Sequence, residues 1–140
     1  MTFKVQHVDP AYIHQVWPTV EPWLAKAFEH SALNKYYNIE HLKDYVIRGE
    51  QVLLVGTDET GEIKGAATIQ WMNCPNARVA YMTSLGGKLI ISKENHQELV
   101  SWVRAMGGTR IEGSARESVA RLWKQKLGYT PRQITMELDV

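Results

Sequence analysis

Two adjacent glycines and a lysine end a predicted strand shortly before a predicted helix, in the run Ser84-Leu85-Gly86-Gly87-Lys88. Backbone N–H groups beside glycine are open to a ligand, and the first turn of a helix offers unpaired donors at the positive end of its dipole. Such a segment can hold the phosphates of an anionic ligand, with Lys88 adding a positive charge. Paired glycines also form simple tight turns. Two interpretations follow for this run, a diphosphate site and a tight turn.

Other reactive side chains indicate little chemistry. The histidines, at positions 7, 14, 30, 41 and 96, show no metal-ligand spacing with cysteine or carboxylates, so no zinc or iron site is expected. No Walker-type or dinucleotide-binding fingerprint is present. The sole cysteine, Cys74, excludes an internal disulfide framework. It lies in the turn-like run Asn73-Cys74-Pro75-Asn76, which favours an exposed spectator thiol over a nucleophile.

Charge is balanced overall but uneven along the chain. The net charge of +1 gives no general attraction to nucleic acid. Between Arg104 and Arg132, however, seven Lys and Arg residues face two Glu, a local excess of +5. This excess is explained by a solvated helix face with cations near its C-terminus, where they suit the helix dipole. The alternative is an anion site for the phosphates of a cofactor or of a nucleic acid, with contact to nucleic acid the less favoured of the two.

Size and composition indicate one globular domain over residues 1–140. Its 44% hydrophobic and 22% charged residues are those of an ordinary water-soluble protein. No apolar run is long enough to span a bilayer, and the start lacks a signal-peptide pattern. The expected location is therefore the cytoplasm, with no membrane partner.

The last third of the chain has the clearest pattern. Residues 109–114 predict a short strand, and apolar residues at helical spacing predict a helix over 115–127. Gly128 stands where a helix C-terminus favours positive φ, with Tyr129 after it. Ile134, Met136, Leu138 and Val140 then alternate with polar residues, which predicts a half-buried strand.

The preceding part predicts a meander of strands between helices. Residues 3–8 fit a first strand, and Pro18 and Pro22 divide the next apolar stripe into two helices. Asn38 is a candidate N-cap for a further helix, and Asn95 begins the one that ends near Met106. Strands are expected over 51–57, 62–72 and 77–85. The order β-α-α-β-β-β-α-β-α-β predicts an α/β (α+β) fold: a mixed, mainly antiparallel sheet with helices on both faces.

This order resembles the GNAT superfamily of acyl-CoA-dependent N-acyltransferases from about Phe3 to Val140. Val52–Thr57, the turn Asp58–Gly61 and the run Ile63-Lys64-Gly65-Ala66-Ala67 resemble its second and third strands. Arg116–Tyr129, which ends Leu-Gly-Tyr, resembles its fourth helix. The resemblance implies a GNAT fold.

Within the superfamily, the chain is most similar to short GNAT-like proteins of tailed bacteriophages. The shared features are Val16-Trp17-Pro18, the stretch from Ile39 to Gln51, Leu85-Gly86-Gly87 and the final Leu-Gly-Tyr. Genes for such proteins tend to lie among virion-structure genes, and one in short-tailed phages encodes an internal virion protein. The resemblance therefore implies a phage protein, in the host cytoplasm or in the virion.

The resemblance also assigns roles to particular residues. In the superfamily, the segment between the fourth strand and third helix holds the CoA pyrophosphate. The implied cofactor-binding residues are Ser84, Leu85, Gly86, Gly87, Lys88 and Trp123. The candidates for catalysis are Glu112, as a base, and Tyr81, lining the cleft. Glu112 paired with Arg110 or Arg116 is the structural alternative, and Tyr81 and Ser84 equally suit ordinary strand positions.

Two family features are altered. The Gly-x-Gly/Ala that opens the third helix is replaced by Gly86-Gly87-Lys88, several residues before Asn95. The tyrosine that often protonates the thiolate has no counterpart, because Lys124 or Trp123 occupies that place. Lys124 is expected to be a solvated surface residue, and Tyr129 lies beyond the helix.

Two functions follow. The first is acetyl-CoA-dependent N-acyl transfer to an amine of a small molecule or a protein, without a metal. The second is a catalytically silent GNAT-like phage protein that acts in virion assembly or host interaction through contacts with phage structural proteins. The sequence names neither the acceptor nor the oligomeric state.

Overall fold

A single five-stranded sheet forms the centre of the computed structural model, which describes residues 3–90 and 92–140. Its strands lie in chain order: β1 (Lys4–His7), β2 (Val52–Thr57), β3 (Ile63–Cys74), β4 (Ala77–Gly87) and β5 (Arg110–Gly113). Neighbouring strands are antiparallel except β4 and β5, which are parallel. The sheet is therefore mixed and mainly antiparallel, as predicted.

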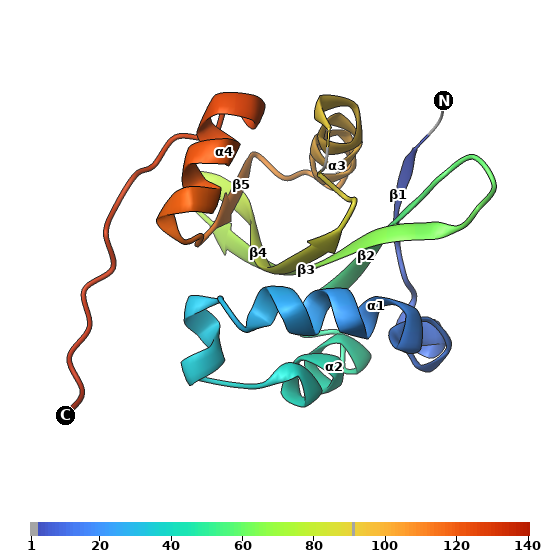
Figure 1. Ribbon diagram of the computed structural model, residues 1–140, viewed down its shortest axis with the longest axis horizontal. Helices are drawn as coiled ribbons and strands as arrows, with labels where there is room; N and C mark the ends of the chain where they lie inside the picture. Colours follow the sequence, from blue (N-terminus) through green and yellow to red (C-terminus); the bar gives the residue numbers. More distant parts are fainter. Residues whose placement is uncertain (1–2, 91) are drawn as a thin grey trace.

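Helices cover both faces of this sheet, which confirms the predicted fold class (Figure 1). One layer holds α1 (Ile13–Phe28) and α2 (Ile39–Ile47), with short 3₁₀ helices η1 (Pro10–Tyr12) and η2 (Ala32–Lys35). The opposite layer holds α3 (Lys93–Ala105) and α4 (Glu117–Leu127). In the part of the chain that the structure describes, the helices are all too short or too polar to cross a membrane.

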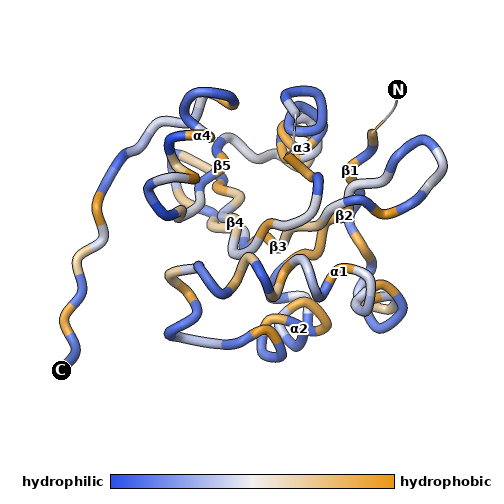
Figure 2. The backbone as a smooth tube through the Cα atoms, viewed as in Figure 1, coloured by the Kyte–Doolittle hydropathy of each residue, from blue (hydrophilic) through white to orange (hydrophobic). Residues whose placement is uncertain are grey.

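Each face of the sheet has its own hydrophobic core, because successive strand residues point to opposite faces. Leu53 and Val55 of β2 pack with Trp17, Val20 and other residues of the α1–α2 layer. The alternate residue Leu54 belongs to the second core, which also contains Leu99 of α3. Figure 2 shows hydrophobic residues along the central strands and polar residues along the outer helix turns.

The two prolines do not divide α1, so the predicted division of this stripe into two helices is wrong. Pro18 and Pro22 lie inside one continuous helix. They are four residues apart on its exposed side, as is His14. The carbonyls that lose an N–H partner, those of His14 and Pro18, therefore belong to exposed residues and can bind water instead. The buried face of the helix stays intact.

The ends of the other helices lie close to the positions that the sequence predicted. The side chain of Asn38 caps α2, and Gly128 ends α4 with a φ of +81°. At α3, the N-cap is Ser92, whose hydroxyl accepts from the backbone N–H of Asn95. Asn95 itself is buried in the first turn, so it is not the cap that the sequence predicted. Cys74 is exposed at the end of β3.

The strand predicted over residues 134–140 is not formed. Residues 130–140, here named the C-terminal segment, are extended, pair with no strand of the described chain and run away from α4 (Figure 1). The alternating pattern identified an apolar face, but a strand also needs an edge to pair with. Among the described residues, α4 is therefore the last regular element, and the predicted final strand is wrong.

Candidate functional site

The parallel strands β4 and β5 separate at a β-bulge. Their pairing runs from Val79 with Arg110 to Met82 with Gly113 and ends there, while β4 continues to Gly87. On its other side β4 shifts register against β3 at the same place, since Thr68 faces Ser84 and Ile69 faces Met82. Thr83 is thus an extra residue in β4. A bulge bends its strand, so it accounts for the divergence from β5.

A buried chain of hydroxyl groups holds the bulge. The Thr83 hydroxyl donates to Gln51 Oε1 at 2.6 Å. Since a hydroxyl has one proton, Thr83 must accept its 2.7 Å bond from Thr68, which in turn accepts from Ser84. Gln51 Nε2 reaches Tyr37 Oη at 3.4 Å. All but Tyr37 are buried, so each unmade bond would be costly and the bulge has one preferred arrangement.

The two predicted glycines lie at the end of β4 and face α1 and β3. A Cβ on Gly86 would stand 2.7 Å from the carbonyl oxygen of Trp23, in α1. A Cβ on Gly87 would stand 2.7 Å from the carbonyl oxygen of Lys64, and Gly87 has a φ of +68°. Close packing of backbone therefore requires glycine at both positions, whatever ligand lies nearby.

The connection from β4 to α3 is fixed by Asn95. Its Nδ2 donates to the carbonyl oxygen of Lys88 at 2.9 Å, while its buried Oδ1 has no hydrogen-bond partner among the described residues. Lys88 and Lys93 are exposed beside the first turn of α3, which also contains Glu94. This end of α3 combines N-terminal N–H groups with two lysines, which suits a phosphate.

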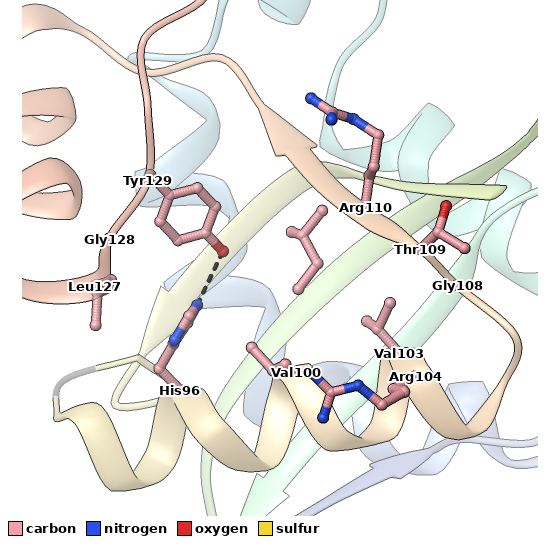
Figure 3. Close-up of a pocket in the computed structure, with 11 residues that line it drawn as sticks. His96, Val100, Val103, Arg104, Gly108, Thr109, Arg110, Leu127, Gly128 and Tyr129 are labelled. Atoms are coloured by element: carbon pink, nitrogen blue, oxygen red, sulfur yellow. Dashed lines mark hydrogen bonds between the residues drawn. The ribbon is translucent and has the colours of Figure 1, made fainter. Parts of the chain in front are cut away.

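A cavity of about 490 Å³ lies between α3, β5 and the end of α4 (Figure 3). Its lining is apolar along Val100, Val103 and Leu127, with Arg104 and Arg110 at the rim. His96 and Tyr129 lie at the end nearest the start of α3, and their side chains point toward each other (Figure 3). The cavity thus joins a hydrophobic floor to a polar pair.

Tyr129 and His96 form that pair, which the sequence analysis did not identify. Tyr129 Oη lies 2.9 Å from His96 Nε2, and the Tyr129 ring also packs against Trp123 at a centroid distance of 5.3 Å. Burial lowers the pKa of His96 and raises the pKa of Tyr129 to about 12. Both groups are therefore neutral at pH 7. A separation of 33 residues gives no sequence pattern from which this pair could be predicted. The position of His96 on the apolar face of α3 indicates only that it is buried.

Burial of His96 makes the free energy of unfolding depend on pH. Because the pKa of folded His96 lies below the value of 6.5 for an exposed histidine, the unfolded chain binds the proton first. The free energy of unfolding should fall as pH drops below about 6.5, until the folded-state pKa is reached.

Urea unfolding between pH 7.5 and 5 should show a shallower fall for His96→Gln than for the wild type. His14→Gln, on the exposed side of α1, is the control and should keep the wild-type slope. Equal slopes for His96→Gln and wild type would contradict this prediction.

The predicted catalytic candidates are brought together on neighbouring strands. Tyr81 pairs in register with Glu112, and Tyr81 Oη lies 2.8 Å from the hydroxyl of Ser114. Both carboxylate oxygens of Glu112 face guanidinium groups, Arg110 at 3.1 Å and Arg132 at 3.5 Å. The predicted structural pairing with Arg110 is thus present, and Arg132 takes the second place. Each carboxylate oxygen of Glu112 is therefore paired with one guanidinium group.

The remaining predicted residues lie apart from this pair. Ser84 is buried in the hydroxyl chain, and Leu85 is half-buried in the second core. Trp123 is half-buried against Tyr129, and Lys124 is exposed, as expected.

No family model and no curated protein sequence matches the chain.

Solved structures do match, over nearly the whole chain. A predicted acetyltransferase from Clostridium acetobutylicum with acetyl-CoA has a TM-score of 0.61 at 14% identity, over 99% of this chain and 96% of that one. An aminoglycoside acetyltransferase from an uncultured soil metagenomic sample, in complex with trehalose, has a TM-score of 0.65 at 14% identity, over 99% and 96%. The aminoglycoside 6′-N-acetyltransferase of Acinetobacter baumannii has 0.59 at 10% identity, over 99% of each chain. The chain has the GNAT fold.

Proposed function

We propose that this protein is an acyl-CoA-dependent N-acyltransferase with acetyl-CoA as its co-substrate. The observation that carries the proposal is the divergence of β4 from β5 at the Thr83 bulge. It leaves the backbone of β4 from Thr83 to Gly87 without a strand partner on the β5 side, next to the N-terminus of α3. An unpaired strand edge beside a helix N-terminus suits a ligand that carries both amides and phosphates.

Each part of this site has a task. Acetyl-CoA supplies a thioester, whose carbonyl carbon an amine nitrogen can attack while the thiolate leaves. Lys88, Lys93 and the first turn of α3 would hold the phosphates. Backbone N–H groups near Ser84 and Leu85 would polarise the thioester carbonyl. Glu112 would receive the proton that the amine loses, and Tyr81 would line the cleft as a polar group.

The acceptor amine would approach from the α1–α2 side. A second cavity, of about 340 Å³, lies there between η2 and the β5–α4 connection. Its lining contains Glu29, Lys35 and Arg116, together with Glu137 of the C-terminal segment. Glu29 at this entrance suits a cationic amine, of a small molecule or of a protein side chain, whereas Glu137 is paired with Lys35 at 2.8 Å.

Binding of acetyl-CoA is the first expected result. A ligand that binds only the native state at 100 times its Kd adds about 2.7 kcal/mol of stability. For a chain of this size that raises Tm by roughly 5–10 °C. Lys88→Glu combined with Lys93→Glu should weaken binding about tenfold or more, because two phosphate contacts become repulsive. Lys4→Glu, on the far edge of the sheet, is the control and should bind normally.

Turnover is the second readout of the same proteins. Release of free CoA thiol in the presence of a panel of amines would identify the acceptor. Absence of a thermal shift with millimolar acetyl-CoA would overturn the proposal. That result would favour the alternative, a silent GNAT-fold protein of a phage particle that works through protein contacts.

A further inference from the structure

The C-terminal segment, residues 130–140, runs from the end of α4 to the level of the α1–α2 layer (Figure 1). Near its start, a guanidinium nitrogen of Arg132 lies 3.5 Å from Glu112 Oε1, on β5. Further along, Glu137 Oε1 lies 2.8 Å from Lys35 Nζ, in η2. An extended chain covers at most roughly 18 Å between positions 132 and 137. The segment is therefore tied at two points and bridges β5 and η2.

These two elements flank the smaller cavity, which is the proposed entrance for the acceptor amine. Its lining comes from η2 on one side and from residues 114–116, which follow β5, on the other. Glu137 belongs to the lining, so the segment covers part of the opening. Glu112, the proposed base, lies just before residue 114 and has Arg132 on one of its oxygens. The segment thus lies over the route of the amine and beside the group that would take its proton.

Charge holds the segment in this place more than apolar contact does. Ile134, Met136 and Leu138 are 85–87% exposed, so the segment buries little apolar surface. The side chains of Lys35 and Glu137 are themselves 58% and 62% exposed. An exposed ion pair shifts an equilibrium by only about 1.4- to 5-fold. The two ion pairs therefore favour the attached position and still allow the segment to leave.

We propose that the C-terminal segment is an autoinhibitory strap, which must leave the entrance before the acceptor amine can bind. The inference rests on the proposed acyltransferase function and adds a means of regulation to it. Departure of the segment uncovers the cavity and takes Arg132, a positive charge that repels a cationic amine, away from Glu112. Since only the open form binds the amine, the apparent Kd is the intrinsic Kd divided by the open fraction.

Release of both ion pairs should therefore increase turnover. Arg132→Gln combined with Glu137→Gln, the released variant, should raise kcat/KM for the acceptor about 2- to 25-fold, mainly through a lower KM. Acetyl-CoA is the donor, butylamine and a lysine-containing peptide are the acceptor probes, and release of CoA thiol is measured. The two substitutions together leave the net charge unchanged. Arg121→Gln combined with Asp139→Asn makes the same change of charge away from both ion pairs and should keep the wild-type values.

Coupling with a carbodiimide locates the segment without reference to activity. This reagent joins an amine to a carboxylate in contact with it, and peptide mass mapping identifies the pair. The wild type should form a link between Lys35 and Glu137, mapped on the monomer band of a denaturing gel. Lys64 and Glu62, 3.0 Å apart, are the internal control, because their link does not depend on the segment.

The two measurements separate the possible failures. Absence of the Lys35–Glu137 link, with the control link formed, overturns the strap and leaves the proposed function standing. Equal kcat/KM for the wild type and the released variant, while acetyl-CoA still raises Tm, overturns it as well. Absence of any thermal shift with acetyl-CoA overturns the proposed function, and the regulatory role of the strap falls with it.

Discussion

Replacing Gly87 with alanine should lower the free energy of unfolding by about 2–5 kcal/mol. The left-handed backbone of Gly87, with a φ of +68°, costs about 1–2 kcal/mol with a β-carbon present. The new Cβ would also meet the Lys64 carbonyl oxygen at 2.7 Å and Gly65 Cα at 2.8 Å. Because both are backbone atoms of β3, the strand must move, at a further cost of roughly 1–3 kcal/mol. Urea unfolding at pH 7 measures the difference.

Gly61 supplies a matched control for this change. It also has positive φ, +84°, but a Cβ there would meet no heavy atom within 4 Å. Gly61→Ala should therefore show the backbone cost alone, about 1–2 kcal/mol. Equal losses at both positions would show that the packing of β4 on β3 does not require glycine at position 87. If Gly87→Ala loses more unfolding free energy than Gly61→Ala, the substitution disturbs the packing of β4. Weaker ligand binding by a Gly87 variant would then reflect this disturbance as well as any lost phosphate contact.

Thr83→Val should destabilise the protein by about 1–3 kcal/mol and weaken acetyl-CoA binding. Valine keeps the shape but removes the hydroxyl that donates to Gln51 Oε1 at 2.6 Å, so a buried acceptor loses its partner. Thr68 loses its 2.7 Å bond at the same time. With the bulge no longer held by this chain, the edge of β4 should vary in position, and the ligand Kd should rise. Unfolding and thermal shift with acetyl-CoA give the two quantities.

Thr83→Ser separates the hydroxyl from the methyl group. Serine can make both hydrogen bonds and should keep acetyl-CoA affinity near the wild-type value. If valine is as stable and binds as tightly as threonine, the hydroxyl chain does not hold the bulge.

The sequence predicted the sheet and both helical layers because periodicity reports burial directly. Val52–Val55 and Leu99–Val103 carry patterns that a single packing satisfies. The bulge at Thr83 left no such mark, since one extra residue in a strand arises from pairing with β3. The His96–Tyr129 pair was missed for the same reason, because the fold joins residues far apart in sequence.

Local rules also failed where the surroundings compensated. Pro18 and Pro22 predict a break, yet both stand on the exposed side of α1, where water replaces the lost donors. The diglycine run allowed either a diphosphate site or a tight turn. In the structure it ends β4, where a Cβ on Gly86 or Gly87 would stand 2.7 Å from a backbone oxygen of α1 or β3. The strand over residues 134–140 was predicted from its alternating apolar face alone. The sequence did not show which strand edge it could pair with.

The two prolines of α1 also bear on the order of folding. Each removes a donor from the helix and excludes the preceding residue from its preferred conformation, so residues 13–28 have little helical tendency as a free peptide. Docking of Trp17, Val20 and Leu24 on the sheet must supply what the local sequence withholds. Because short turns join β2, β3 and β4, we expect this meander to assemble early and α1 to dock on it late in folding.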